Sequence, residues 1–403
     1  MIRFLHAADL HLGLRVTRFG AEVNGRVQEA RLKALETLVA KAGDVDFVLI
    51  AGDLFDDNHV NAGTSRRALE LFQSIGRPVF IIPGNHDPLT ADSVFSRPPW
   101  SSISGGNVNL LRTSEAVALP GGTLLPCPLF AKNSLDDPTR WITPRAPGDA
   151  NIRIGLAHGS LNDRENLPPD DHLIDRHVAD AKGLDYLALG HWHSPSRHAD
   201  RGGAIRTVYP GVHEPMRFSE SPDFAIGWSA YSNTERTDLF TDDGRGRALI
   251  VTIEKAGAVP QIDEIDTGRL QWREETYTIR DEQELSSLID QLGRRPGQEH
   301  QLLRLHLQGT LPARALARLD ELDATLAGGQ GGVLSRYHWA DLDIKQLHAQ
   351  PTDAELQELA GNGIVRAVYD RLRAESAHSD PAVHATSRES LLLLYRFAQE
   401  VRR

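Results

Sequence analysis

Five short polar motifs each follow directly behind an apolar run of the kind that forms a buried β-strand. They are Asp9-Leu10-His11, Gly52-Asp53-Leu54-Phe55-Asp56, Gly84-Asn85-His86-Asp87, Ala157-His158-Gly159 and Gly190-His191-Trp192-His193. In an open α/β sheet, ligands gather at the carboxyl ends of the strands. The chain is therefore expected to bring these polar side chains together at one edge of a layered α/β domain.

Helical patterns separate the first apolar runs from one another. Apolar residues recur at helical spacing over residues 26–43 and 63–75, and these segments lie between apolar runs at 2–8, 47–51 and 78–82. Strands that alternate with helices predict a sheet that begins largely parallel.

The pattern changes after about residue 266, so we expect a domain boundary there. Residues 1–265 are expected to form the first domain, and residues 266–348 a smaller β-α-β-α-β unit. Residues 349–403 are expected to form C-terminal helices. The last of these begins at the capping-box pattern Thr386-Ser387-Arg388-Glu389 and then carries four consecutive leucines.

The five motifs are weak signals one by one, because each has an ordinary structural explanation as a turn or a hydrogen-bonded strand end. Together they offer seven oxygen and nitrogen ligands that an apolar core does not explain. Carboxylate, amide oxygen and imidazole suit manganese, iron or zinc, and the lack of thiolates argues against a structural zinc site. Two such ions about 3.5–4 Å apart can stabilise both oxygens of a phosphoryl displacement. The motifs therefore predict phosphoester hydrolysis.

Composition excludes some broad classes of protein. The net charge of −11 opposes a general nucleic-acid coat protein but not a nuclease, since bound divalent metal can hold phosphate on an acidic chain. No apolar run approaches about 18 residues, so no membrane association is expected. The start of the chain lacks the pattern of a signal peptide. A single cysteine, Cys127, fits a reducing cytoplasm, which is the expected location.

Four stretches of residues 1–215 resemble the calcineurin-like metallophosphoesterase superfamily, and within it the SbcD and YhaO branch of DNA-repair exonucleases. They are residues 4–13, 51–56, 83–87 and 189–193. The resemblance implies a four-layer α/β/β/α sandwich, with the smaller β-α-β-α-β unit as a capping domain. It also implies two bound divalent metal ions, with Mn²⁺ as the expected ion.

The resemblance assigns a role to each motif residue. Asp9, His11, Asp53 and His193 would surround one ion, and Asp53, Asn85, His158 and His191 the other, with Asp53 as the bridge. His86 would not bind metal but would stabilise or protonate the leaving oxygen; a histidine that only begins a helix is the alternative.

The chain departs from the family pattern in two places. Residues 57–61 replace the proline-containing turn that often follows the second motif. After the turn Tyr209-Pro210-Gly211 the sequence continues unusually, and there His213 and Arg217 are candidates to contact the scissile or a flanking phosphate. Ordinary surface residues are the alternative for both.

The resemblance implies a DNA nuclease with 3′-to-5′ exonuclease and single-strand endonuclease activity, acting in DNA repair. The alternative is a phosphoesterase that acts on small-molecule phosphodiesters or phosphoproteins, although Asp57-Asn58 stands where protein phosphatases usually have Arg-Gly. A non-catalytic scaffold is disfavoured because all motif residues are present.

An SMC-like ATPase of the SbcC type is the partner that the resemblance implies. The apolar last helix, with Tyr395, Phe397 and Val401 besides its leucines, suits such docking. Packing against the chain's own helix at residues 353–373 is the alternative. A homodimer is also compatible with the resemblance.

Overall fold

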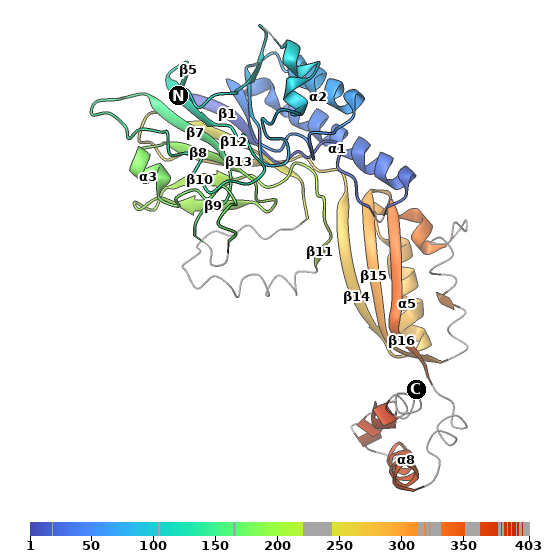
Figure 1. The fold of residues 1–403 in the computed structure, drawn as a ribbon. Coiled ribbons are helices and arrows are strands. Elements are labelled where there is room, and N and C mark those ends of the chain that lie inside the picture. Colours follow the sequence, from blue (N-terminus) through green and yellow to red (C-terminus); the bar gives the residue numbers. More distant parts are fainter. Residues whose placement is uncertain are drawn as a thin grey trace. The chain divides into compact units, whose positions relative to one another are not determined.

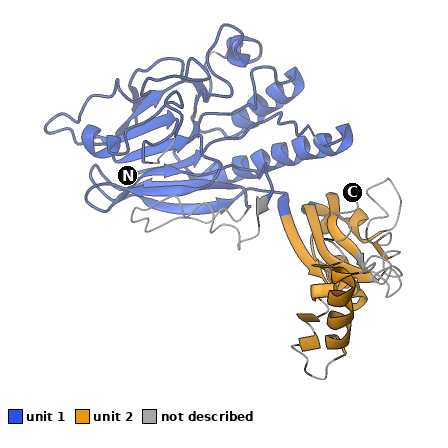
Figure 2. Ribbon diagram, turned by 60° about the horizontal axis from the view of Figure 1, so that its bottom comes forward, with its two compact units in different colours: residues 1–273, 300–302 blue, residues 274–299, 303–403 orange. Residues whose placement is uncertain are grey.

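The computed structural model describes residues 1–220, 244–312, 332–350 and 363–377, except for Arg18, Ser104 and residues 164–166. It also describes scattered positions within 318–322 and 380–397. The chain divides into two compact units (Figure 2). Unit 1 comprises residues 1–273 and 300–302, and unit 2 comprises residues 274–299 and 303–403.

The first sheet of unit 1 has the strand order β13-β12-β1-β2-β3-β4. Its four neighbouring parallel strands are β1 (Ile2–Ala7), β2 (Phe47–Ala51), β3 (Val79–Ile82) and β4 (Val108–Leu110). Antiparallel strands β12 (Arg247–Ile253) and β13 (Gln261–Asp266) complete the other edge. Because side chains alternate along a strand, Val48 and Ile50 of β2 face the helices while Phe47 and Leu49 face the second sheet.

The second sheet has the order β5-β6-β7-β8-β10-β9. Its strands are β5 (Val117–Leu119), β6 (Gly122–Cys127), β7 (Ile152–His158), β8 (Tyr186–Gly190), β9 (Ser196–Ala199) and β10 (Ile205–Tyr209). The two sheets share one apolar core. In it Phe4 of β1 stacks on Phe47 at 5.2 Å and meets the edge of Tyr186 of β8 at 5.4 Å.

Helices cover the outer faces of the two sheets (Figure 1). Helices α1 (Ala21–Lys41) and α2 (Ala62–Ser74) pack on the first sheet, whereas α3 (Val178–Lys182) and neighbouring loops pack on the second. Short 3₁₀ helices span Ala42–Asp44, Val94–Ser96 and Trp100–Ser102. The expected mixed α/β class with two multistranded sheets is confirmed, but the layer on the second sheet contains a helix of only five residues among the described positions.

A third sheet has the order β11-β14-β15-β16, with β11 (Ser219–Glu220), β14 (Gln271–Ile279), β15 (Gln301–Pro312) and β16 (Trp339–Gln350). Helix α5 (Glu282–Arg294) packs on it to form the core of unit 2, and 3₁₀ turns span Gln298–His300 and Val333–Arg336. Pro312 ends β15, and most of residues 313–326, where the second helix of the expected β-α-β-α-β unit would lie, are outside the described part.

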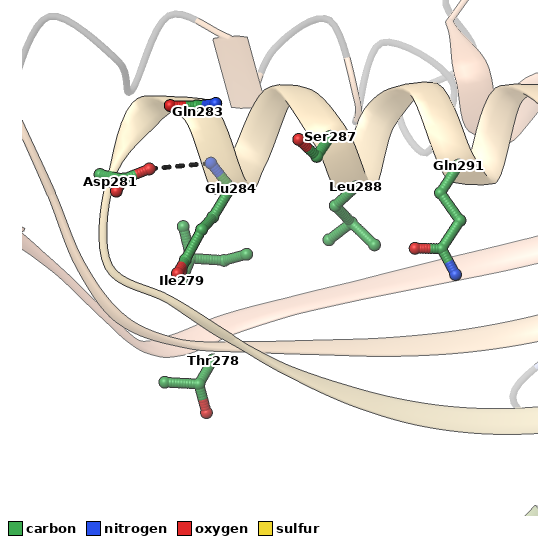
Figure 3. A pocket seen from close by; sticks show the side chains of 8 residues that line it. All are labelled: Thr278, Ile279, Asp281, Gln283, Glu284, Ser287, Leu288 and Gln291. Atoms are coloured by element: carbon green, nitrogen blue, oxygen red, sulfur yellow. Dashed lines mark hydrogen bonds between the residues drawn. The ribbon is translucent and has the colours of Figure 1, made fainter.

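Unit 2 also contains a small polar pocket and the C-terminal helical residues. The pocket, of about 440 Å³, lies where α5 begins (Figure 3) and is lined by Thr278, Ile279, Asp281, Gln283, Glu284, Ser287, Leu288 and Gln291. Helix α8 (Ile364–Glu375) buries Tyr369 against Leu391. Residues 353–362 of the helix expected at 353–373, and much of the helix expected at 386–403, lie outside the described residues. None of the helices that the structure describes is long and apolar enough to cross a bilayer.

Candidate metal centre

The parallel strands of the two sheets carry the five motifs to one place. The segment behind β1 pairs with the segment behind β2, since Asp9 N donates to Gly52 O at 3.2 Å and His11 N to Asp53 O at 3.0 Å. In the second sheet, Gly159 N donates to Gly190 O at 3.2 Å. The two sheets meet here closely: a side chain at Gly190 would begin 2.0 Å from Ala51 O. The strand ends therefore converge.

Backbone strain is concentrated at this convergence. Asp9, His11, Asp53 and His191 have φ angles of 53°, 42°, 50° and 114°, a region that residues other than glycine rarely occupy. Such conformations cost of order 1–3 kcal/mol each and persist where the surroundings enforce them, often at functional sites. The described residues include just one further non-glycine case, His172.

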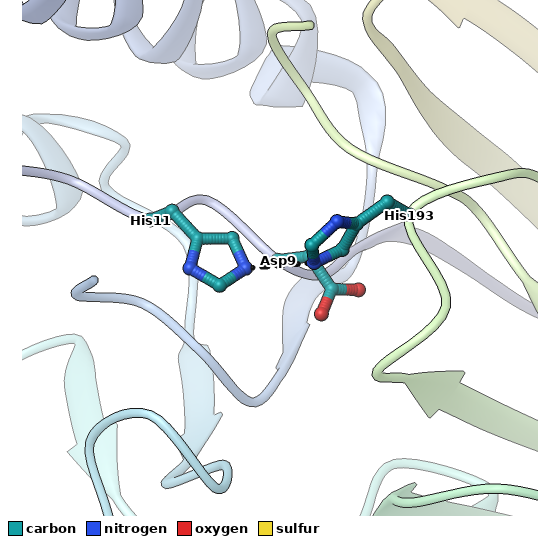
Figure 4. A group of neighbouring side chains, drawn as sticks. All are labelled: Asp9, His11 and His193. Atoms are coloured by element: carbon teal, nitrogen blue, oxygen red, sulfur yellow. Dashed lines mark hydrogen bonds between the residues drawn. The ribbon is translucent and has the colours of Figure 1, made fainter. Parts of the chain in front are cut away.

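The first group of ligand atoms comprises Asp9, His11 and His193 (Figure 4). His11 Nε2 lies 3.1 Å from His193 Nε2. Burial lowers the pKa of His11 and lowers that of His193 to about 2, so both imidazoles are neutral. Burial also raises the pKa of Asp9 to about 7. Two ring nitrogens that face each other beside a buried carboxylate suit a shared cation.

Asp53 lies between this group and the next. Its Oδ2 is 3.7 Å from His11 Nε2 and 3.3 Å from His158 Nε2, and its Oδ1 accepts the His86 N–H at 2.8 Å. Burial alone would raise the pKa of Asp53, but the His158 imidazole and other neighbouring histidines hold it below its usual range. An ionised carboxylate between two sets of imidazoles can bridge two ions.

Asn85, His158 and His191 complete the second group. Asn85 Oδ1 lies 2.8 Å from His158 Nε2 and 3.1 Å from His191 Nδ1. Because His158 Nδ1 donates to the Ala51 carbonyl at 2.8 Å, its Nε2 is the nitrogen that faces Asn85 and Asp53. Burial lowers the pKa of His158, but the Asp53 carboxylate outweighs this and raises it to about 9. A cation at this point would take the place of that proton, so the donor set fits a second divalent ion.

His86 lies beside both groups. Its Nδ1 donates to the Asp56 carbonyl at 2.8 Å, and its ring packs edge-on against His11 at 4.6 Å. Nε2 is therefore the ring nitrogen that could exchange a proton with substrate. The catalytic role expected for His86 stays a prediction.

The two residues expected to contact phosphate have different surroundings. Arg217 is exposed and donates to the Ser194 hydroxyl at 3.0 Å, next in the chain to His193. His213 is fully buried, and its Nε2 donates to the Arg31 carbonyl at 3.0 Å. A buried ring without exposed atoms cannot contact a phosphate from the surface, so the expectation for His213 is corrected to a role inside the protein.

Several supporting residues had no role in the sequence interpretation. Asp56 Oδ1 lies 3.3 Å from His11 Nδ1, and Asp87 accepts the backbone N–H groups of Phe55 and Gly84. Arg31, fully buried on α1, donates twice to the Leu10 carbonyl, at 3.1 and 2.7 Å. Asp56 and Asp87 stand inside motifs, but no pattern in the sequence marks Arg31.

The sequence profile of the calcineurin-like phosphoesterase family matches residues 2–195, a range that contains all seven proposed ligands and His86. The uncharacterized metallophosphoesterase YhaO of Bacillus subtilis (strain 168) is 26% identical over 240 residues, which cover 55% of this chain and 55% of that protein. The DNA double-strand break repair protein Mre11 of Aeropyrum pernix is 28% identical over 283 residues, which cover 66% of this chain and 64% of that protein.

Mre11 of Methanopyrus kandleri is 27% identical over 245 residues, covering 55% of this chain and 51% of that protein. The matched regions thus span about half to two thirds of these curated relatives. Among solved structures, the protein TT1561 of Thermus thermophilus aligns with a TM-score of 0.38 and 11% identity, over 66% of this chain and 99% of that one. The strands whose ends carry the ligand atoms lie within the matched range, and residues 2–195 of this chain therefore form a calcineurin-like metallophosphoesterase domain.

Proposed function

We propose that this protein is a metal-dependent DNA nuclease of the 3′-to-5′ exonuclease and single-strand endonuclease type, which acts in DNA repair. The convergence of two ligand groups on the shared carboxylate of Asp53 supports phosphodiester hydrolysis. The names of the Mre11 relatives support DNA as the substrate. A cytoplasmic location and a homodimer stay predictions.

The proposed mechanism divides the work between a metal pair and the chain. Two divalent ions, Mn²⁺ by our prediction, would supply a hydroxide at neutral pH and stabilise the attacking and leaving oxygens. Asp53 would bridge them, with the other six ligands around it. His86 Nε2 would give a proton to the leaving oxygen, since its Nδ1–H is held by the Asp56 carbonyl. Arg217 would contact a flanking phosphate.

A substrate panel in the presence of Mn²⁺ tests the proposed function. It contains linear DNA, a cyclic nucleotide, a phosphopeptide and a chromogenic phosphodiester. We expect nucleotides to be released from linear DNA, and the Asp53→Ala variant serves as the inactive control. Hydrolysis of only the three small substrates would overturn the nuclease proposal and support a small-molecule phosphodiesterase or a phosphatase.

An SMC-like ATPase of the SbcC type is the partner we propose, and the C-terminal helical residues supply an apolar surface for it. Leu391 packs against Tyr369 of α8, as the self-packing alternative requires. The side chains of Ile364, Leu393 and Phe397 are 84%, 52% and 62% exposed. Exposed apolar side chains on helices suit a helical partner.

Two kinds of variant separate docking from self-packing. We expect Leu393→Ser with Phe397→Ser to melt like the parent protein but to lose binding of a purified SbcC-type ATPase from the same organism. Leu391→Ala should instead destabilise the protein, by about 2–5 kcal/mol if Leu391 is part of a folded core. Leu135→Ser, at a side chain of unit 1 that is 75% exposed, is the matched control. Unchanged ATPase binding by the double variant would contradict the docking surface.

A further inference from the structure

The loop around Asp171 is fixed closely against the motif that contains His158. Ile174 N donates to Ser160 O at 2.8 Å, and His172 N donates to Ser134 O at 3.2 Å. A side chain at Gly159 would begin 2.3 Å from His172 O, so glycine is needed for this approach. The loop is therefore held in place by its backbone, independently of the Asp171 side chain.

The Asp171 carboxylate points at a proposed metal ligand. Its Oδ2 accepts a hydrogen bond from Ser160 Oγ at 2.5 Å and lies 3.2 Å from His191 Nε2. A carboxylate oxygen accepts hydrogen bonds, so the His191 nitrogen that faces Asp171 Oδ2 is the donor of this contact.

This contact decides which nitrogen of His191 is available to a metal. Because Nε2 carries the hydrogen donated to Asp171, the lone pair is on Nδ1, and Nδ1 is the atom 3.1 Å from Asn85 Oδ1. His158 is arranged in the complementary way, with Nδ1–H on the Ala51 carbonyl and Nε2 toward Asn85. Each histidine of this group has its outer nitrogen fixed by an acceptor.

We infer that Asp171 is a positioning residue that fixes the tautomer and ring orientation of His191 for the second metal ion. The inference rests on the proposed function, since it assumes that Asn85, His158 and His191 bind metal. Outer-shell carboxylates of this kind typically change metal affinity or activity by about 10–100-fold when they are replaced. The loop with residues 170–174 would then contribute to the metal centre without contributing a ligand.

Metal titration of the full chain by calorimetry tests the inference. We expect Asp171→Ala to bind Mn²⁺ about 10–100-fold more weakly at one of two sites, and Asp171→Asn, which keeps an acceptor oxygen without the charge, to lose less. Asp170→Asn is the matched control, because it removes the same charge from the neighbouring residue, whose backbone carbonyl bonds to Ser134 N. All three variants should melt like the parent protein, since the loop is held by backbone bonds.

A spectroscopic readout separates positioning from general electrostatics. In Zn²⁺-loaded protein labelled with ¹⁵N-histidine, His191 should show a protonated Nε2, assigned by comparison with His191→Gln, and Asp171→Ala should alter that signal. If the parent protein binds two ions and Asp171→Ala keeps both the metal affinity and the His191 tautomer, the inference about Asp171 is wrong while the proposed metal centre stands. If Asp170→Asn loses as much metal affinity as Asp171→Ala, the effect comes from net charge and the inference is also wrong. A parent protein that binds no divalent ion would overturn the proposed metal centre itself.

Discussion

Asp53→Ala is expected to lose bound metal together with all nuclease activity. Two divalent cations about 3.7 Å apart repel each other by about 18 kcal/mol at an effective dielectric constant of about 20, so a bridging anion is required between them. Asp53 is the carboxylate that lies near both ligand groups, at 3.7 Å from His11 Nε2 and 3.3 Å from His158 Nε2. Metal content per chain after gel filtration in Mn²⁺, measured by atomic emission, should fall from two to one or none.

Asp57→Asn provides a control for this experiment, because it removes a carboxylate four residues away on an exposed side chain. It should keep both ions and the parent rate. Asp53→Asn is a useful intermediate, since the amide preserves shape and a hydrogen-bond acceptor for His86 N but carries no charge. Two metal equivalents in Asp53→Ala would contradict the bridging role and would move the bridge to another ligand such as Asp9.

The strand-end motifs could be found from the sequence because two independent signals coincide there. Continuous apolar runs such as 47–51 identify buried parallel strands, and polar residues directly behind them cannot belong to the core. Since parallel strands end at the same edge, residues as far apart as Asp53 and His158 could be expected to meet, and in the structure they lie 3.3 Å apart. The parallel order of the strands thus predicts that these residues are close in space, although they lie far apart in the sequence.

Residues that support the site from loops or helices gave no such signal. Asp171 stands in a polar, proline-containing loop, and Arg31 stands on a helix among other charged residues. Their roles arise only when tertiary packing brings them to His191 and to the Leu10 carbonyl. For His213 the sequence suggested a functional contact that the structure does not support. A histidine in a turn-rich segment is usually exposed, but this one is buried together with Arg31 and Glu214.

Where a strand begins and ends depends on its pairing with neighbouring strands more than on the pattern of apolar residues in its own sequence. β6 was not expected, because it begins at a glycine and contains Pro126, both poor strand residues. It forms because it lies between β5 and β7 and pairs with both. Likewise the alternation of apolar residues in β15 is clear only over residues 303–307, but the strand extends over Gln301–Pro312 as the middle partner of β14 and β16.

The second large effect is expected at His86. Replacing it with glutamine should lower the rate of DNA hydrolysis by about 10²–10⁴-fold, the usual contribution of a positioned general acid, while both ions remain bound. Metal should be retained because residue 86 contacts Asp53 through its backbone. The N–H of position 86 donates to Asp53 Oδ1 at 2.8 Å, and the substitution leaves this hydrogen bond in place. Initial rates and metal content measured on the same preparation check both parts.

The leaving group distinguishes proton donation from other contributions of His86. The 3′ oxygen that leaves DNA is strongly basic and needs a proton, whereas the phenolate released from a chromogenic phosphodiester leaves without one. If His86 Nε2 supplies the proton, His86→Gln should therefore lose much less activity on the chromogenic ester than on DNA. Equal losses on both substrates, with metal retained, would mean that His86 stabilises charge or orients substrate instead. Loss of a metal ion from His86→Gln would instead identify His86 as a ligand. A ring nitrogen of His86 lies within 4.8 Å of the ligand atoms of His11 and Asp53, so this outcome is possible.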